Sequence, residues 1–173
     1  CLLREVPGRD IVVIGASAGG VPALLELTRE LPADIPAGLF VAVHGSPDAP
    51  SLLPELLSHA GDVPASFAVD GEPIKLGRIY VAPRDRHLLV TGGKLEVTRG
   101  PQENGFRPAV DPLFRTAAES HGPRVVGIVL SGGLNDGTYG LKIIKRHGGI
   151  AIAQRVEDAL VPSMPLSAIQ NVE

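Results

Sequence analysis

The chain has 173 residues, of which 44% are hydrophobic, and its formal net charge at pH 7 is −3. This length suits one domain with a substantial core, and the hydrophobic content excludes a disordered chain. The mild negative charge and an aromatic content of 3% without tryptophan argue against a nucleic-acid-binding surface. The one cysteine is Cys1, so neither a disulfide framework nor a cysteine zinc cluster is expected.

The apolar runs have the length of strands, and no signal peptide is visible. The sequence therefore predicts a cytoplasmic protein without membrane insertion. We expect a single domain over residues 1–173, and the abrupt ends of the chain suggest a piece of a longer protein.

Strand and helix patterns alternate along the chain. Strands are predicted at 11–14, 39–43, 65–69, 78–82, 125–130 and 150–153, and helices at 21–31, 50–59, 111–121, 136–147 and 163–171. Residues 87–91 and 94–98 predict a hairpin, because Gly92 and Gly93 can supply positive φ angles. A polar loop with glycine and proline covers 99–108. This order predicts an α/β fold: a doubly wound, mostly parallel sheet with helices on both faces and the hairpin as an antiparallel edge.

The first predicted strand runs into a glycine-rich turn, Gly15-Ala-Ser-Ala-Gly-Gly20. The spacing Gly15-x-Ser17-x-Gly19 is typical of the nucleophile elbow of serine hydrolases, and the following helix start offers N–H groups that favour negative charge. A dinucleotide-binding turn fits less well, because Ser17 stands where a pyrophosphate needs glycine, and the Gly-Lys-Ser/Thr ending of a P-loop is absent. A glycine turn with an incidental serine is the plain alternative.

Three polar residues follow predicted strands at the carboxyl ends, where parallel α/β sheets bind ligands: Ser17, His44 and Asp136. Their types are those of a hydrolytic triad, with a nucleophile, a general base and a carboxylate that orients the base. Each also has a simpler explanation, since His44 could be a polar strand end and Asp136 could cap the helix that follows it. His87 is the rival base, and Asp111 is expected to cap its own helix.

The motifs together resemble the catalytic domain of the bacterial chemotaxis protein-glutamate methylesterase family, CheB. The matching segments are Ile14–Gly20, Val43-His44 with Pro47, Tyr80–Pro83 with His87, Arg107–Asp111 with Leu113-Phe114, Gly127–Gly132 with Asn135–Gly137, Gly148-Gly149, Ile152–Gln154 and Met164-Pro165. They occur in the family's order and extend through nearly the whole chain.

The resemblance implies a catalytic Ser17, a base His44 and an orienting Asp136. It also implies a reaction, the hydrolysis of glutamate γ-methyl esters on the cytoplasmic signalling helices of methyl-accepting chemotaxis receptors with release of methanol, together with deamidation of some receptor glutamines. The resemblance implies no cofactor, and the sequence contains neither metal-ligand spacing nor a phosphate loop. Members of the family often carry a receiver domain, so a receiver or methyltransferase domain of the same longer protein is an expected partner.

Two segments depart from the family pattern. Ala18 follows the nucleophile where the family usually has threonine, and Gly132-Gly133-Leu134 stands where the family commonly has Gly-Met-Gly. We expect Ala18, Gly132, Gly133 and Asn135 to form the wall or the oxyanion region of the site. Because of these departures, two other functions stay open: a serine esterase for another acyl substrate, and a non-catalytic domain that docks on receptors.

Overall fold

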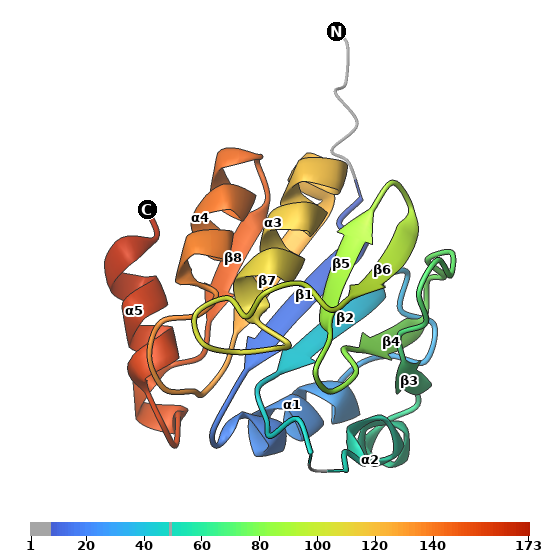
Figure 1. Ribbon diagram of the computed structural model, residues 1–173, viewed down its shortest axis with the longest axis horizontal. Helices are drawn as coiled ribbons and strands as arrows, with labels where there is room; N and C mark the ends of the chain where they lie inside the picture. Colours follow the sequence, from blue (N-terminus) through green and yellow to red (C-terminus); the bar gives the residue numbers. More distant parts are fainter. Residues whose placement is uncertain (1–7, 49) are drawn as a thin grey trace, which may run out of the picture.

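The structure is a computed structural model that describes residues 8–48 and 50–173. Its centre is a six-stranded sheet in the order β3-β4-β2-β1-β7-β8, and all of its strand pairs are parallel (Figure 1). The strands of this sheet are β1 (Ile11–Ala16), β2 (Gly38–Val43), β3 (Ala65–Phe67), β4 (Arg78–Val81), β7 (Val125–Val129) and β8 (Ile150–Ala153). The predicted parallel α/β sheet is therefore confirmed.

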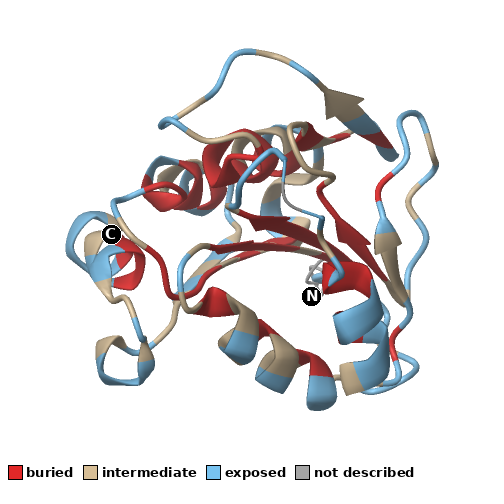
Figure 2. Cartoon of the chain, turned by 60° about the horizontal axis from the view of Figure 1, so that its bottom comes forward, coloured by how far each residue is buried: buried red, intermediate tan, exposed pale blue. Residues whose placement is uncertain are grey.

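Helices cover both faces of the sheet (Figure 2). They are α1 (Gly20–Arg29), α2 (Leu53–Ala60), α3 (Val110–His121), α4 (Thr138–Arg146) and α5 (Ser163–Asn171). Val13 and Ile14 are consecutive in β1 and enter two separate core clusters. The cluster of Ile14 includes Leu24 of α1 and Leu57 of α2, whereas that of Val13 includes Phe114 of α3. Because both faces are covered, every residue of β2 is buried.

The predicted hairpin is present as β5 (His87–Thr91) and β6 (Lys94–Thr98), with the expected bounds. These strands form a two-stranded antiparallel sheet of their own instead of extending the edge of the larger sheet. Leu88 and Leu95 belong to the same core cluster as α3, so the hairpin packs over that face of the molecule.

Several element bounds differ from the sequence-based expectation. The helix expected from residue 50 begins at Leu53, because Pro54 and not Pro50 takes the early position where a missing N–H is harmless. The strand expected to reach Val69 ends at Phe67, since the Val69 N–H donates to Glu72 Oε1 at 2.8 Å and the chain turns away. The helix expected from residue 136, α4, begins at Thr138, so Asp136 precedes it. In the part of the chain that is described, no helix is both long and apolar enough to cross a membrane.

Candidate active site

Ser17 follows β1 directly and lies on a sharp turn into α1. Its N–H donates to the carbonyl of Ser131 at 2.9 Å, and its carbonyl accepts from the Gly20 N–H at 3.0 Å. Gly19 caps the helix with φ +74°, and a Cβ there would lie 2.6 Å from Leu160 Cβ. Both the backbone conformation and this close approach require glycine. The turn therefore has the strand-elbow-helix geometry that the glycine spacing predicted, with Ser17 half-buried.

His44 follows β2 and is the neighbour of Ser17 across the sheet. Ala16 and Val43 are partners in the β1–β2 register, and the His44 N–H donates to the Ala16 carbonyl at 3.1 Å. The His44 side chain is 3% exposed, and its Nε2 lies 2.7 Å from Asp136 Oδ2. The carboxylate can only accept from a ring N–H, so this contact assigns a proton to Nε2 and leaves Nδ1 as an acceptor.

Nδ1 of His44 is buried and has no hydrogen-bond partner among the described residues. A buried polar atom without a partner is uncommon and calls for an explanation. His44 follows the strand end next to the one before Ser17, although no hydrogen bond joins the two side chains in the described part of the chain. Catalytic hydrogen bonds are often long in unliganded sites and tighten when a substrate binds.

Asp136 is fully buried and is surrounded by donors. Besides His44, it accepts from the N–H groups of Val110 at 2.6 Å and Asp111 at 3.1 Å, and from Asn104 Nδ2 at 2.7 Å. Burial acts to raise the pKa of this carboxyl, but the hydrogen bonds from His44, Val110 and Asn104 outweigh it and hold the pKa below 3.8. Asp136 is therefore ionised at neutral pH and can stabilise a protonated His44.

The two aspartates cap each other's helices. Asp136 precedes α4 but accepts the first N–H groups of α3, whereas Asp111 lies in α3 and accepts from Gly137 and Gly140, at the start of α4, at 3.1 and 2.7 Å. The expectation that Asp111 caps its own helix is therefore wrong, and so is the simpler explanation of Asp136. Burial and the nearby charge of Asp136 raise the pKa of Asp111.

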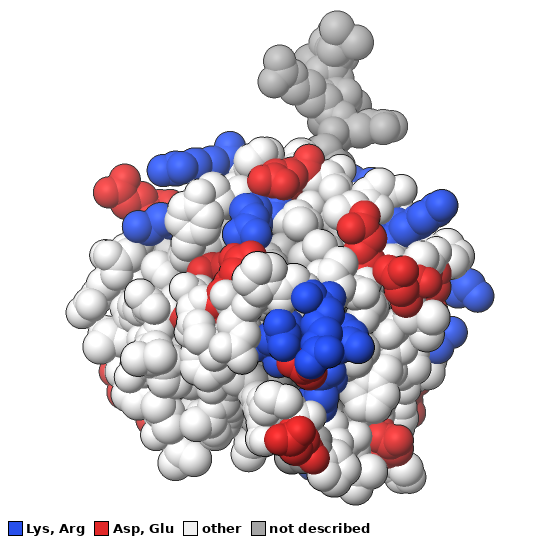
Figure 3. Space-filling view, in the orientation of Figure 1, with Lys and Arg blue, Asp and Glu red and all other residues white. Residues whose placement is uncertain are grey.

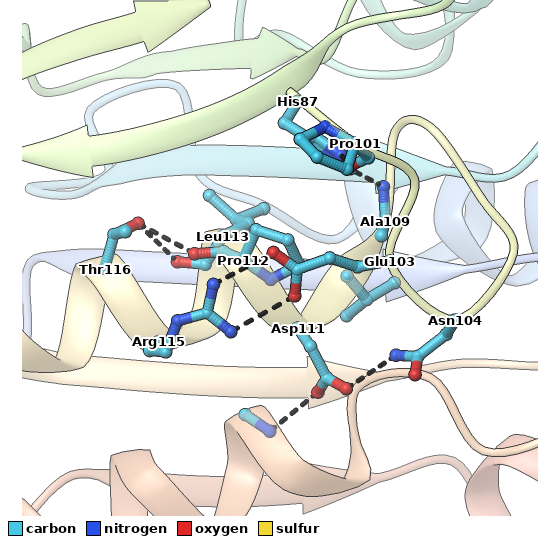
Figure 4. Close-up of polar contacts among 12 residues, drawn as sticks. His87, Pro101, Glu103, Asn104, Ala109, Asp111, Pro112, Leu113, Arg115 and Thr116 are labelled. Carbon is cyan, nitrogen blue, oxygen red and sulfur yellow. Dashed lines mark hydrogen bonds and ion pairs between the residues drawn. The ribbon is translucent and has the colours of Figure 1, made fainter. Parts of the chain in front are cut away.

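A loop closes over the base and the aspartates, and we call residues 99–109 the strap. Phe106 stacks on the His44 ring with centroids 3.6 Å apart and planes 6° apart. Asn104 Nδ2 donates to Asp111 Oδ2 at 2.8 Å (Figure 4). It also donates to Asp136 Oδ1. Neither Asn104 nor Phe106 could be predicted as a site residue from the sequence, because an aperiodic loop carries no signal of what it covers.

His87, the rival base, holds the strap in place. Its Nε2 lies 2.8 Å from the Pro101 carbonyl, and its Nδ1 accepts from the Ala109 N–H at 3.2 Å (Figure 4). The residue is 4% exposed, and both ring nitrogens are engaged by backbone groups. No nitrogen of His87 is left to exchange a proton with Ser17.

The residues expected in the site wall differ in how closely they pack around Ser17. A Cβ on Gly132 would lie 2.7 Å from Ser17 Cβ and would overlap Met164 Sδ, so Gly132 packs directly against the serine. A Cβ on Gly133 would meet nothing within 4 Å. Ala18 is exposed, and its carbonyl accepts from Ser131 Oγ at 2.8 Å.

Asn135 is exposed and borders a surface hollow that Asn104 and Asp111 also line. It therefore lies beside the aspartate pair, and no hydrogen bond joins it to Ser17 in the described residues. Leu134, next to it, has φ +63° and is 66% exposed.

The fold and this site define an α/β protein with serine, histidine and aspartate on three adjoining strand ends. The family model for CheB methylesterase matches residues 12–173, and the chain belongs to this family. The crystal structure of the Thermotoga maritima CheB methylesterase catalytic domain is similar with a TM-score of 0.89 and 36% identity, covering 95% of this chain and 89% of that one.

Two curated relatives are similar over most of this chain. A protein-glutamate methylesterase/protein-glutamine glutaminase of Myxococcus xanthus, numbered 4, is 40% identical over 90% of this chain and 44% of its own length. One of Pyrococcus abyssi is 37% identical over 96% of this chain and 46% of its own length. The chain thus spans a little under half the length of these relatives.

Proposed function

We propose that this domain is a serine hydrolase that removes methyl groups from glutamate γ-methyl esters of chemoreceptor signalling helices and releases methanol. The observation that carries the proposal is the buried His44–Asp136 pair. His44 follows the strand end that pairs with the one before Ser17, and its Nδ1 has no hydrogen-bond partner among the described residues. The names of the relatives supply the ester and also support deamidation of receptor glutamines.

In the proposed reaction Ser17 Oγ attacks the ester carbonyl while His44 Nδ1 takes the hydroxyl proton. Asp136 stabilises the imidazolium through Nε2, so the two ring nitrogens exchange the roles they have in the chymotrypsin-type triad. The tetrahedral intermediate then loses methoxide, which receives the proton from Nδ1 and leaves as methanol. Water, activated by the same nitrogen, attacks the acyl-serine and releases the glutamate carboxylate. A glutamine follows the same steps with ammonia as the leaving molecule.

The oxyanion needs backbone donors that are not already used. The Gly132 N–H donates to the Val161 carbonyl at 2.9 Å, so this residue serves as wall and not as donor. The N–H groups of Ala18 and Gly133 donate to no backbone carbonyl within residues 8–48 and 50–173. We assign these two groups to the oxyanion, because free donors aimed at developing charge are a large catalytic contribution.

The proposed partners follow from the substrate. Receptor signalling helices lie in the cytoplasm, and we assign the domain to that compartment. A receiver or methyltransferase domain of the same longer protein is our proposal for its regulator, and the greater length of the relatives supports it.

Labelling with a fluorophosphonate tests whether the site is catalytic. A serine hydrolase forms an adduct on Ser17, whereas a domain that only docks on receptors does not react there. The rates of methanol release from methylated receptor fragments and from small acyl esters then identify the substrate class. Turnover of small esters without turnover of receptor fragments would favour the alternative esterase.

A further inference from the structure

A concentrated positive charge borders the candidate active site. Lys and Arg side chains gather near the middle of the face drawn in Figure 3. We call the following residues the arginine group: Arg84, Arg86, Arg99 and Arg107. Arg86, Arg99 and Arg107 form ion pairs with Asp85, at 3.6, 2.9 and 2.6 Å respectively. Four arginines less one aspartate leave +3 in a chain whose net charge is −3.

Two members of the arginine group are neighbours of residues that lie next to His44. Arg107 follows Phe106, whose ring stacks on His44. The Arg84 guanidinium packs on Gly45, the residue after His44, so closely that a Cβ on Gly45 would overlap it. The arginine group therefore lies close in the structure to the residues on either side of the base.

The members of the arginine group differ in how far they are used inside the protein. Arg107 is structural, since its Nη1 donates to the Gly100 carbonyl at 2.7 Å and its Nε to Asp85 at 2.8 Å. The hydrogen bond from Arg107 holds the pKa of Asp85 below its usual value, so this carboxylate is ionised and cancels one positive charge. The side chains of Arg86 and Arg99 are 40% and 64% exposed.

Arg84 forms no ion pair with any described carboxylate. Its nearest acidic neighbour in the same surface hollow is the exposed Asp48. Counting Asp48 as well as Asp85 still leaves a charge of +2, so the arginine group has capacity for anions from outside the chain.

We propose that the arginine group binds glutamate carboxylates that flank the reacting ester on an acidic helix of the substrate protein. This inference rests on the proposed function and specifies its substrate: a helix rich in glutamates. Each hydrolysis turns a neutral ester into a carboxylate, so a segment with several such sites becomes more acidic as the reaction proceeds. Arginine suits this role because its planar guanidinium pairs with carboxylates through two parallel hydrogen bonds.

The test compares the binding of two helical peptides that share one glutamate methyl ester. One peptide has glutamate flanks and the other has glutamine flanks. Binding is measured by fluorescence anisotropy in the Ser17→Ala background, so that no turnover consumes the ester. The double variant Arg86→Gln/Arg99→Gln should weaken binding of the acidic peptide about tenfold at low salt and leave the glutamine-flanked peptide within about twofold. The tenfold difference should shrink as salt screens the charges.

Two further variants serve as controls. Arg146→Gln removes one exposed arginine from the last turn of α4, outside the arginine group, and should change neither affinity. If the double variant does not fold by circular dichroism, Arg86→Gln alone serves as the test variant. Among the described residues, the Arg86 side chain forms one ion pair, at 3.6 Å, and one hydrogen bond, both with Asp85. Arg86→Gln should weaken binding of the acidic peptide about threefold.

Two results would overturn the proposal. One is equal affinity of the two peptides for the Ser17→Ala protein with all four arginines present, and the other is an equal loss of affinity for both peptides in the double variant. Binding to anionic phospholipid vesicles without preference for the acidic peptide would assign the surface to a membrane instead. Selective binding together with no methanol release by the protein with Ser17 intact would retain the arginine group and refute the proposed reaction.

Discussion

At the scale of single residues, the two aspartates look alike but are used differently. Both are buried and both accept from Asn104, yet their backbone donors are distributed unequally. In Asp136, each carboxylate oxygen accepts one backbone N–H, and Oδ2 also accepts from His44. In Asp111, Oδ1 takes both backbone donors. An amide at position 111 can keep its oxygen toward both backbone donors and loses only the hydrogen bond from Asn104. An amide at position 136 must turn its NH₂ group toward a backbone N–H whichever way it lies.

Asp136→Asn should therefore impair both activity and stability. Whichever way the new amide lies, its NH₂ opposes a backbone N–H, which should lower the free energy of unfolding by about 1–3 kcal/mol. Ester turnover should fall about 10⁴-fold, because the amide cannot stabilise a protonated His44. The matched control, Asp111→Asn, should keep most of the turnover and lose less stability. Urea unfolding and methanol release check both variants, and equal effects of the two substitutions would contradict this assignment.

The raised pKa of Asp111 predicts a pH dependence with a definite sign. In the folded state burial and Asp136 raise this pKa above 3.8, so the folded protein holds the proton more tightly than the unfolded chain. The stability from Asp111 is thus fully present below pH 3.8 and is lost as pH rises through the folded-state pKa.

The free energy of unfolding, measured with urea as pH rises from 3.8, should fall for the unsubstituted protein relative to the Asp111→Asn variant. Asp136 has a lowered pKa and works in the opposite direction, losing stability as pH falls through its folded value, but it is present in both proteins. A difference that rises with pH would refute the raised pKa of Asp111.

Gly132 and Gly133 offer another matched pair beside the nucleophile. Gly132→Ala places a methyl group against Ser17 Cβ and into Met164 Sδ, so we expect turnover to fall about 10²-fold through displacement of the serine. Gly133→Ala meets open space and should leave turnover and stability nearly unchanged. Steady-state ester hydrolysis by the two variants is the measurement. Comparable losses would mean that the wall matters through its flexibility and not through contact.

At the scale of elements, the strap joins the base to the aspartate pair. His87 anchors its two ends, Phe106 covers the His44 ring, and Asn104 bridges the carboxylates. Asn104 holds φ +53°, a conformation that asparagine and glycine adopt more readily than other residues. The strap is therefore positioned by side chains from several elements, and it fixes the ring plane and the carboxylate together.

Asn104→Gly should lower turnover about tenfold while the fold is kept, since glycine accepts the backbone angle and only the bridging amide is lost. The loss should appear in kcat more than in KM, because Asn104 orients Asp136 and need not touch the substrate. Asn104→Asp is the informative companion, as a third carboxylate beside the pair should be worse than glycine. Unchanged kcat in both variants would show that Asn104 does not orient Asp136 for catalysis.

The sequence predicted the elements well where the pattern is periodic or where glycines mark a turn. The hairpin and β8 have the expected bounds, and the elbow around Ser17 follows from its glycine spacing. The strap could not be predicted, because residues 99–109 show no hydrophobic period and their contacts with His44 and Asp136 join residues far apart in the sequence. The exchanged helix caps were missed for the same reason, since the Asp111 N–H and Asp136 Oδ1 are 25 residues apart. Capping preferences assume a local partner, and here the partner is tertiary.

At the scale of the whole molecule, strand order brings the candidate triad together. β1 lies between β2 and β7, so the turns after these three strands meet at one edge of the sheet (Figure 1). Ser17 and His44 follow paired strand ends, and Asp136 contacts His44 from the turn after β7. The order of the three residues in the sequence is therefore irrelevant to the chemistry, as expected for a triad defined by geometry.

The most direct test of the central claim is methanol release from methylated receptor fragments by the unsubstituted domain and by Ser17→Ala. We expect that the domain releases methanol and that Ser17→Ala lowers the rate by about 10⁶-fold, to the background, with an unchanged circular dichroism spectrum and melting temperature. A folded Ser17→Ala variant that retained about a tenth of the rate would contradict the assignment of Ser17 as nucleophile.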